Sequence, residues 1–273
     1  MGEKLMLSAS RLKICGIQFN ISLSNVEKNI KTVESILTET EKADLVVLPE
    51  LWYTGFDYRN LHYHAKNSNY FIDLVKGWCQ RFGMGFLSTF LTWDEKKNGV
   101  YNTIYLIDEE GNITGKYSKM YLFQPMKEDK HFLRGDKNQK NIFPFKGWNI
   151  ATAICYEVRF PEIMRKAALN GAELGIIPTE WPDLRLDHWL SLTKARAIEN
   201  EMYVMGVNAC GKTGKWNMAG HSVIYDPWGN TMSLLDDKEG VILAEIDKEN
   251  ITQMRKNIPS VNDASRFKFF LNQ

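Results

Sequence analysis

Short runs of apolar residues, each ending in a polar or reactive side chain, mark the predicted strands of this chain. Leu45-Val46-Val47-Leu48 is continuously aliphatic, as is typical of a central parallel strand covered on both faces, and it ends at Pro49-Glu50. Residues 150–154 carry apolar side chains on both faces of an extended segment and stop at Cys155. Further strands are predicted at residues 12–19, 86–91, 103–107, 112–117, 173–178, 203–208, 222–225, 231–235 and 241–246.

Helical periodicity separates these strands. Apolar residues recur at helical spacing from Val26 to Leu37, and Ser24 and Glu27 have the spacing of a capping box at the start of that helix. Pro161 suits the first turn of another helix, and Gly171 suits its left-handed end. Other helices are predicted at residues 71–82 and 187–201, with a short one after residue 248. Since no linker or low-complexity segment interrupts the chain, we expect one layered α/β domain over residues 1–273.

Composition narrows the class of protein. A chain of 273 residues that is 44% hydrophobic can bury a large core, which excludes a disordered protein. The net charge is +1 with acidic and basic residues interspersed, so neither a nucleic acid nor a membrane is expected as partner, and a small molecule fits better. No stretch resembles a signal peptide or a membrane span, and we expect a cytoplasmic protein.

The four cysteines are residues 15, 79, 155 and 210, and they are widely spaced. They form neither a CxxC pair nor a Cys/His cluster, so the sequence predicts reduced thiols, no structural metal site and no cofactor. Cys155 stands at the carboxyl end of a strand, where open α/β sheets place their chemistry. The residues around it leave two interpretations open, a nucleophile or a small buried hydrophobe.

Three charged residues admit an ordinary and a functional interpretation. Glu50 follows a strand and precedes the apolar segment Leu51-Trp52-Tyr53, so it is either a solvated loop residue or a buried general base. Lys119 lies among aromatic residues, although lysine is usually a surface side chain. Glu128 by itself looks like an ordinary loop charge.

Taken in chain order, Leu48-Pro49-Glu50, Lys119 and Cys155 resemble the Glu-Lys-Cys pattern of the nitrilase superfamily of carbon-nitrogen hydrolases, over nearly the whole chain. Residues 154–162 are similar to the nucleophile segment of the omega-amidase branch, where aspartate is more common than the Glu157 found here. The same branch matches residues 180–182, 195–200 and 220–222. Glu128 matches an additional glutamate of the family. The resemblance implies a four-layer α-β-β-α sandwich of the nitrilase type, in the α/β class.

The resemblance also implies a mechanism. Glu50 would take the proton of Cys155 and return it to the leaving ammonia, and it would then activate water against a thioester. Lys119 and the backbone N–H of Tyr156 would hold the developing oxyanion. Glu128 would sit behind Lys119 and keep it charged and correctly aimed.

Arg159 is the candidate for substrate specificity. It lies four residues past the nucleophile, and a guanidinium group binds a carboxylate in a bidentate manner. With Trp181 and Phe56 as apolar walls, this predicts a carboxylate-bearing amide such as 2-oxoglutaramate or 2-oxosuccinamate as substrate. The alternative is that Arg159 pairs with Glu157 or Glu162 as a structural clamp.

Other functions remain open at this stage. The enzyme alternatives are an N-carbamoyl amino-acid amidohydrolase and another small-amide or nitrile hydrolase. An interaction module that kept the fold without its activity is the alternative of another class.

We also expect a homodimer or a higher homo-oligomer. The helix around residues 195–200, the helix after Pro161 and the apolar tail near Phe269 and Phe270 are the segments that a two-fold dimer would bury. The tail, residues 248–273, is too apolar to stay in water and is expected to dock on a neighbouring subunit.

Overall fold

The protein was analysed as a computed structural model that describes residues 10–267. Within that range there are two six-stranded sheets. In the first sheet, the last strand of the range forms one edge and pairs with the first strand. Its strands, in the order in which they are hydrogen-bonded, are β14 (Gly240–Asp247), β1 (Arg11–Gln18), β2 (Leu45–Val47), β3 (Gly85–Asp94), β4 (Gly99–Ile107) and β5 (Ile113–Ser118). β1, β2 and β3 run parallel, and the outer strands pair antiparallel.

The second six-stranded sheet of the described range has the same plan. Its strands, again in hydrogen-bonded order, are β13 (Thr231–Leu234), β12 (Val223–Tyr225), β9 (Tyr203–Asn208), β8 (Leu174–Thr179), β7 (Trp148–Thr152) and β6 (Ile142–Phe145). β7, β8 and β9 form the parallel centre. A separate hairpin joins β10 (Cys210–Thr213) to β11 (Trp216–Ala219).

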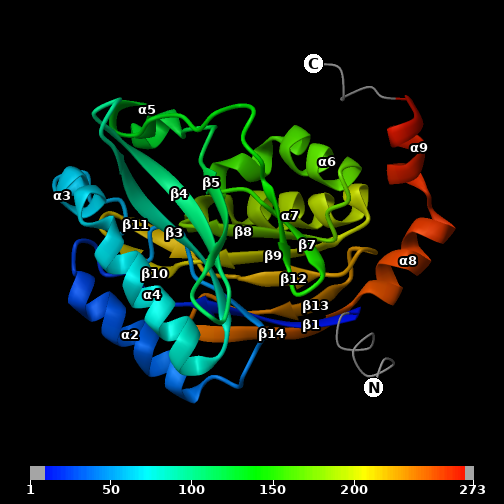
Figure 1. The fold of residues 1–273 in the computed structure, drawn as a ribbon, viewed down its shortest axis with the longest axis horizontal. Coiled ribbons are helices and arrows are strands. Elements are labelled where there is room, and N and C mark those ends of the chain that lie inside the picture. Colours follow the sequence, from blue (N-terminus) through cyan, green and yellow to red (C-terminus); the bar gives the residue numbers. More distant parts are fainter. Residues whose placement is uncertain (1–9, 268–273) are drawn as a thin grey trace.

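Helices cover the outer faces of the two sheets (Figure 1). Beside the first sheet lie α2 (Val26–Glu39), α3 (Leu61–Lys66) and α4 (Ser68–Phe82). Beside the second lie α6 (Pro161–Leu169) and α7 (Leu186–Asn200). The remaining helical segments are the short α5 (Glu128–His131), α8 (Lys248–Asn257), α9 (Ser260–Phe267) and the 3-10 helices Gln124–Met126, Cys155–Arg159 and Asp183–Arg185.

The side-chain alternation of β2 explains why this strand is apolar on both faces. Leu45 and Val47 pack in the core that includes the second sheet, whereas Val46 packs in the core that includes residues of α2 and α4. The result is the predicted four-layer α-β-β-α sandwich, and the fold class is confirmed.

Two local predictions differ from the structure. Ser24 does not cap α2, because its φ of 62° is left-handed; Asn25 is the cap, and its side chain accepts a hydrogen bond from the Lys28 backbone N–H at 3.2 Å. The predicted helix from residue 71 begins at Ser68, and α3 before it was missed.

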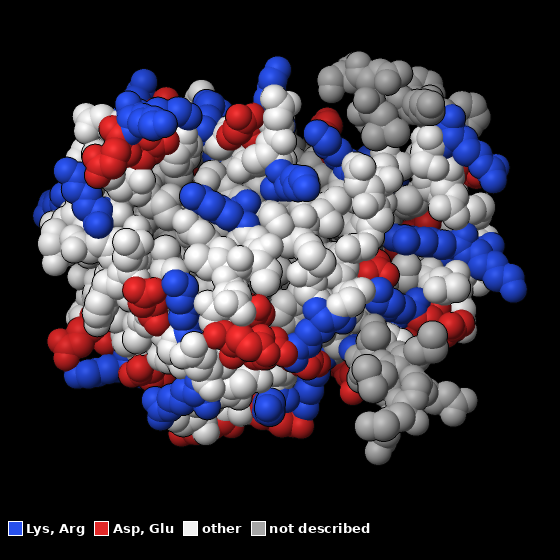
Figure 2. Space-filling model, viewed as in Figure 1, with Lys and Arg blue, Asp and Glu red and all other residues white. Residues whose placement is uncertain are grey.

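The surface and the helices give two further facts. Figure 2 shows Lys and Arg mixed with Asp and Glu over the visible face, with blue side chains also near its middle, so this face has no extended field of one sign. Among residues 10–267, the helices are too short or too polar to cross a bilayer.

Candidate active site

A tight turn after β7 exposes the Cys155 thiol to a pocket. Cys155 is the first residue of the 3-10 helix Cys155–Arg159, and its φ of 48° is left-handed, a conformation that non-glycine residues adopt mainly where the surrounding structure holds them. α6 follows from Pro161, as predicted. Cys155 is 9% exposed and lines the pocket, so its side chain is reachable although residues 150–154 before it are buried.

Glu157 fixes this turn against the segment that carries Lys119. Its carboxylate accepts hydrogen bonds from the backbone N–H groups of Ile154 at 2.8 Å and Met120 at 2.7 Å, and from the Tyr117 hydroxyl at 2.8 Å. Glu157 is fully buried. The position of Cys155 relative to Lys119 therefore depends on one carboxylate that bridges two loops.

Lys119 lies directly after β5 and forms the centre of a buried cluster. Its Nζ is 2.8 Å from Glu50 Oε1 and 2.9 Å from Glu128 Oε1. Glu50 Oε1 also accepts a hydrogen bond from the Asn102 side-chain amide at 2.7 Å, and Glu50 Oε2 accepts one from the Glu180 backbone N–H at 3.3 Å. Both carboxylates and the lysine are shielded from water, so their charges interact strongly.

The electrostatics of this cluster favour a charged lysine. Burial by itself would lower the pKa of Lys119. The negative charges of Glu128 and Glu50 more than offset this, so the pKa lies well above its usual value. Burial raises the pKa of Glu128 to about 7, with Lys119 acting in the opposite direction. Burial and the Glu50 charge raise the pKa of the Cys155 thiol, and Lys119 offsets only part of that. The resting thiol therefore keeps its proton, and attack needs a neighbouring base.

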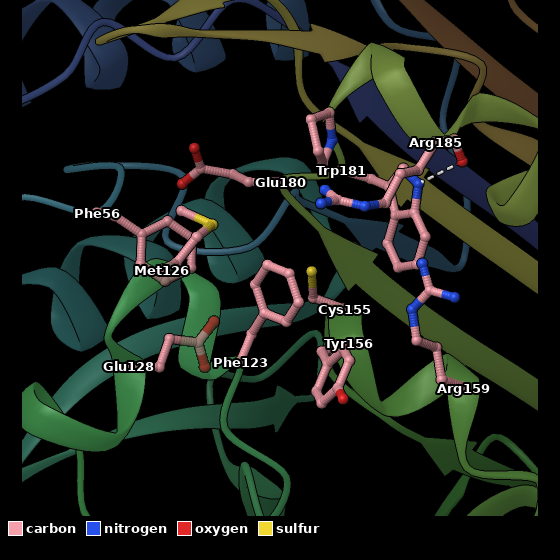
Figure 3. A pocket seen from close by; sticks show the side chains of 11 residues that line it. Phe56, Phe123, Met126, Glu128, Cys155, Tyr156, Arg159, Glu180, Trp181 and Arg185 are labelled. Atoms are coloured by element: carbon pink, nitrogen blue, oxygen red, sulfur yellow. Dashed lines mark hydrogen bonds between the residues drawn. The ribbon is translucent and has the colours of Figure 1, made fainter.

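The pocket above this cluster encloses about 340 Å³, part of it open to solvent (Figure 3). All four predicted substrate-binding residues line it. The lining residues are Phe56, Phe123, Met126, Glu128, Cys155, Tyr156, Arg159, Glu180, Trp181, Pro182 and Arg185. Its size suits a molecule of a few carbon atoms.

Two guanidinium groups face this pocket. Arg159 lies over the Trp181 ring at 4.8 Å, and its Nη2 is 3.2 Å from His188 Nδ1. Arg185 lies over the Phe123 ring at 5.6 Å. Burial and the neighbouring Arg185 charge lower the pKa of Arg159, as expected for two like charges that share one site.

The structural alternative for Arg159 is not supported. Among residues 10–267, Arg159 forms no ion pair with Glu157 or Glu162, and no carboxylate lies within ion-pair distance of Arg185. Glu157 has its own set of partners on the Lys119 segment. The positive charge of the pocket is thus left for a ligand.

The structure brings together Glu50, Lys119, Glu128 and Cys155, and their catalytic roles stay predictions. Other residues at the site were not among the predicted site residues: Asn102, Phe123, Met126, Glu180 and Arg185. A signal existed for Glu180, because it stands at the carboxyl end of β8, as Glu50 and Cys155 stand after β2 and β7. In the described part of the chain, we find no group of three or more His, Cys, Asp or Glu side chains arranged to hold a metal ion.

Comparison with known proteins agrees with this geometry. A family model described as Carbon-nitrogen hydrolase matches residues 13–256. The 2-oxoglutaramate amidase of Bacillus subtilis (strain 168) is 38% identical over 249 residues, which cover 90% of this chain and 95% of that protein. Omega-amidase YafV of Yersinia enterocolitica is 29% identical over 265 residues, covering 94% and 98%.

A solved structure has the same fold. It is a mutant of the amidase from Nesterenkonia sp. AN1 with an acetamide moiety bound covalently at its active-site cysteine; the TM-score is 0.81 at 23% identity, covering 93% of this chain and 97% of that one. Family match, curated relatives and fold agree over almost the full length, and the chain therefore belongs to the carbon-nitrogen hydrolase family.

Proposed function

We propose that this protein hydrolyses a small carboxylate-bearing amide of the omega-amidase type, such as 2-oxoglutaramate or 2-oxosuccinamate, to the acid and ammonia. The observation that carries the proposal is a buried Glu50–Lys119–Glu128 cluster next to the Cys155 thiol. Above it lies a small pocket with two guanidinium groups that have no carboxylate partner among residues 10–267. The names of the two amidase relatives support the same substrate class.

In the proposed reaction, Glu50 removes the proton of Cys155 as the sulfur attacks the amide carbon. The raised pKa of Cys155 makes this base necessary. The carbonyl oxygen becomes an oxyanion that Lys119 Nζ and the Tyr156 backbone N–H stabilise. When the C–N bond breaks, Glu50 returns the proton to the nitrogen, ammonia leaves, and Cys155 holds the acyl group as a thioester.

Water completes the proposed cycle. Glu50 takes a proton from the water that attacks the thioester carbon, the carbon–sulfur bond breaks, and the proton passes to the Cys155 sulfur. Glu128 acts through Lys119, since its Oε1 is 2.9 Å from Nζ and holds the ammonium group in place.

Arg159 and Arg185 would bind the substrate carboxylate. A substrate carboxylate in this pocket would pair with both guanidinium groups. Trp181 holds the Arg159 side chain, and Phe123 the Arg185 side chain, by cation–π contact. Trp181 also donates its indole N–H to the Arg185 carbonyl at 2.8 Å, which links the two arginines in one unit.

The test is ammonia release from a panel of substrates. We expect kcat/KM to be highest for 2-oxo dicarboxylic acid monoamides, lower for neutral amides of the same length, and lower still for nitriles. N-carbamoyl amino acids also carry a carboxylate and are the critical comparison. Faster turnover of a carbamoyl substrate than of any amide acid would replace this proposal with the carbamoylase alternative.

We propose further that residues 1–273 act as one hydrolase domain in a cytoplasmic homodimer. The unbroken family match over 13–256 supports one domain, and four free cysteines suit a reducing compartment. Exposed Ile198, packed beside Gly229, offers apolar surface on α7 for a partner. Arg196 and Asn200 are already buried within the protomer, so they are not free for the interface. Phe269 and Phe270 lie outside the described residues.

A further inference from the structure

Glu180 places a buried carboxyl group in the pocket. Glu180 is 1% exposed, and within residues 10–267 neither of its side-chain oxygens has a hydrogen-bond partner. The side chain lines the pocket of Cys155 and the adjoining hollow next to Trp216 and Met218. Leaving a buried polar group unpaired destabilises the protein, so such a group at a binding site is explained most simply by a ligand that supplies the partner.

The surroundings of Glu180 keep it uncharged. Burial, followed by the negative charge of Glu50, raises the pKa of Glu180 well above its usual value, and Lys119 offsets only part of the shift. An ionised Glu180 would be a third carboxylate around one lysine. The uncharged group offers one acceptor oxygen and one hydroxyl donor.

Glu180 lies on the nitrogen side of the proposed reaction. Its backbone N–H donates to Glu50 Oε2 at 3.3 Å. The backbone of Glu180 is therefore adjacent to the carboxylate that exchanges protons with the substrate nitrogen. In Figure 3 its carboxyl group and the Arg159 guanidinium lie on opposite sides of Cys155. A substrate whose carboxylate is held at Arg159 and whose carbonyl carbon meets Cys155 leaves the far side for its nitrogen.

We infer that Glu180 is a specificity-determining residue, which accepts a hydrogen bond from the unsubstituted NH₂ group of the substrate amide. The inference rests on the proposed hydrolase chemistry of Cys155 but not on the identity of the acid. An NH₂ group carries two hydrogens, of which Glu50 Oε2 can accept one. Glu128 Oε2 also has no hydrogen-bond partner in the described part of the chain, but the other oxygen of that carboxylate binds Lys119, which serves the carbonyl oxygen.

The experiment compares two substrates that give the same acyl-enzyme, the primary amide and the S-methyl thioester of one acid. The thioester has no N–H, and its sulfur is a poor hydrogen-bond acceptor. In Glu180→Leu, kcat/KM for the amide should fall by about 10- to 100-fold, because a buried N–H loses its acceptor, and kcat/KM for the thioester should stay within about threefold. Glu180→Gln keeps an acceptor of the same length and should keep amide turnover within about threefold.

Two further variants complete the design. Glu180→Asp shortens the side chain by one methylene, and kcat/KM should again fall for the amide but not for the thioester. This variant provides the test if the leucine variant does not fold. Glu162→Gln removes a carboxylate from α6, outside this pocket, and should change neither substrate.

The outcomes separate the possibilities. A parallel loss for amide and thioester in Glu180→Leu and Glu180→Asp would overturn the inference in favour of a structural role. Unchanged amide turnover in both would overturn it as well. Because any amide and thioester pair that the enzyme accepts can be used, failure of the 2-oxo acid assignment leaves this result interpretable.

Discussion

Lys119 is completely buried, yet two carboxylates at 2.8 and 2.9 Å keep it charged. A buried charge whose partner is removed is costly, so such a cluster persists only when every member stays in place. The proposed function would explain why the chain keeps it, because an ammonium group held away from water stabilises an oxyanion far better than an exposed one.

This leads to a prediction for Lys119. Lys119→Ala should lower kcat by at least about 100-fold, the scale of losing one oxyanion donor. Single-turnover kinetics would show the loss in the chemical step, with circular dichroism reporting the folded state. A variant with near-normal kcat would show that the lysine is only structural.

Arg159 carries the second residue-scale prediction. Arg159→Lys should weaken kcat/KM for an amide acid because a point charge cannot reproduce a bidentate contact, and Arg159→Ala should weaken it by about 2–3 kcal/mol. A neutral amide of the same length should hardly change. Arg185→Ala should act in the same direction, since both guanidinium groups face one pocket.

The contrary result for Arg159 is a parallel decline. If charged and neutral amides lose turnover equally and the melting temperature falls with them, the guanidinium group stabilises the fold and does not select the substrate.

Single residues also show how far the sequence alone could lead. Glu50, Lys119 and Cys155 could be predicted because each ends or follows a strand and their order matches a known family. Arg185 carries no such signal, because its aim into the pocket depends on how the segment after β8 packs against Phe123. That packing is tertiary and leaves no periodic trace in the sequence.

At the scale of elements, the 3-10 helix Cys155–Arg159 is held by the carboxylate of Glu157. Glu157→Leu would remove the acceptor of the buried Ile154 N–H and Tyr117 hydroxyl, and of the partly buried Met120 N–H. We predict a loss of about 3–5 kcal/mol in the free energy of unfolding, together with reduced turnover.

Urea unfolding measures this directly. Glu157→Asp keeps the charge and should be milder, and Glu162→Gln on α6 serves as control. Unchanged stability in the leucine variant would mean that water or other groups satisfy these donors, and that Glu157 does not fix the turn.

The elements themselves were predicted with uneven success, for physical reasons. Long periodic or continuously apolar segments, such as α2 and β2, were found because burial of one or both faces dictates their pattern. α3 was missed because Leu61–Lys66 is too short to show more than one repeat of its buried face. The capping error at Ser24 arose because Asn25, one residue later, is an equally good cap and the left-handed turn at Ser24 has no sequence signal.

At the scale of the whole molecule, the two parallel strand triplets bring their carboxyl ends to one site. β2 leads to Glu50, while β7 and β8 lead to Cys155 and Glu180 from the other sheet. Lys119 arrives from β5 at the edge of the first sheet. The site therefore exists only when both sheets are packed together.

Assembly gives the prediction at this scale. Light scattering at micromolar concentration should report a species of twice the 31.6 kDa chain mass. Ile198→Asp should shift the protein toward monomer, because Ile198 is 43% exposed on α7 and a buried charge would oppose association. Ile113→Asp, equally exposed on β5, should leave the dimer intact. A wild-type monomer at that concentration would contradict the proposed dimer.

The central claim is that Cys155 forms the acyl bond during amide hydrolysis. The most direct measurement is intact-protein mass spectrometry of the enzyme quenched during turnover of an amide acid, with ammonia release followed in parallel. We predict an adduct of the acyl mass on Cys155, and its absence together with loss of ammonia release in Cys155→Ala, whereas Cys15→Ala, Cys79→Ala and Cys210→Ala retain both. Sustained ammonia release by Cys155→Ala would contradict the account.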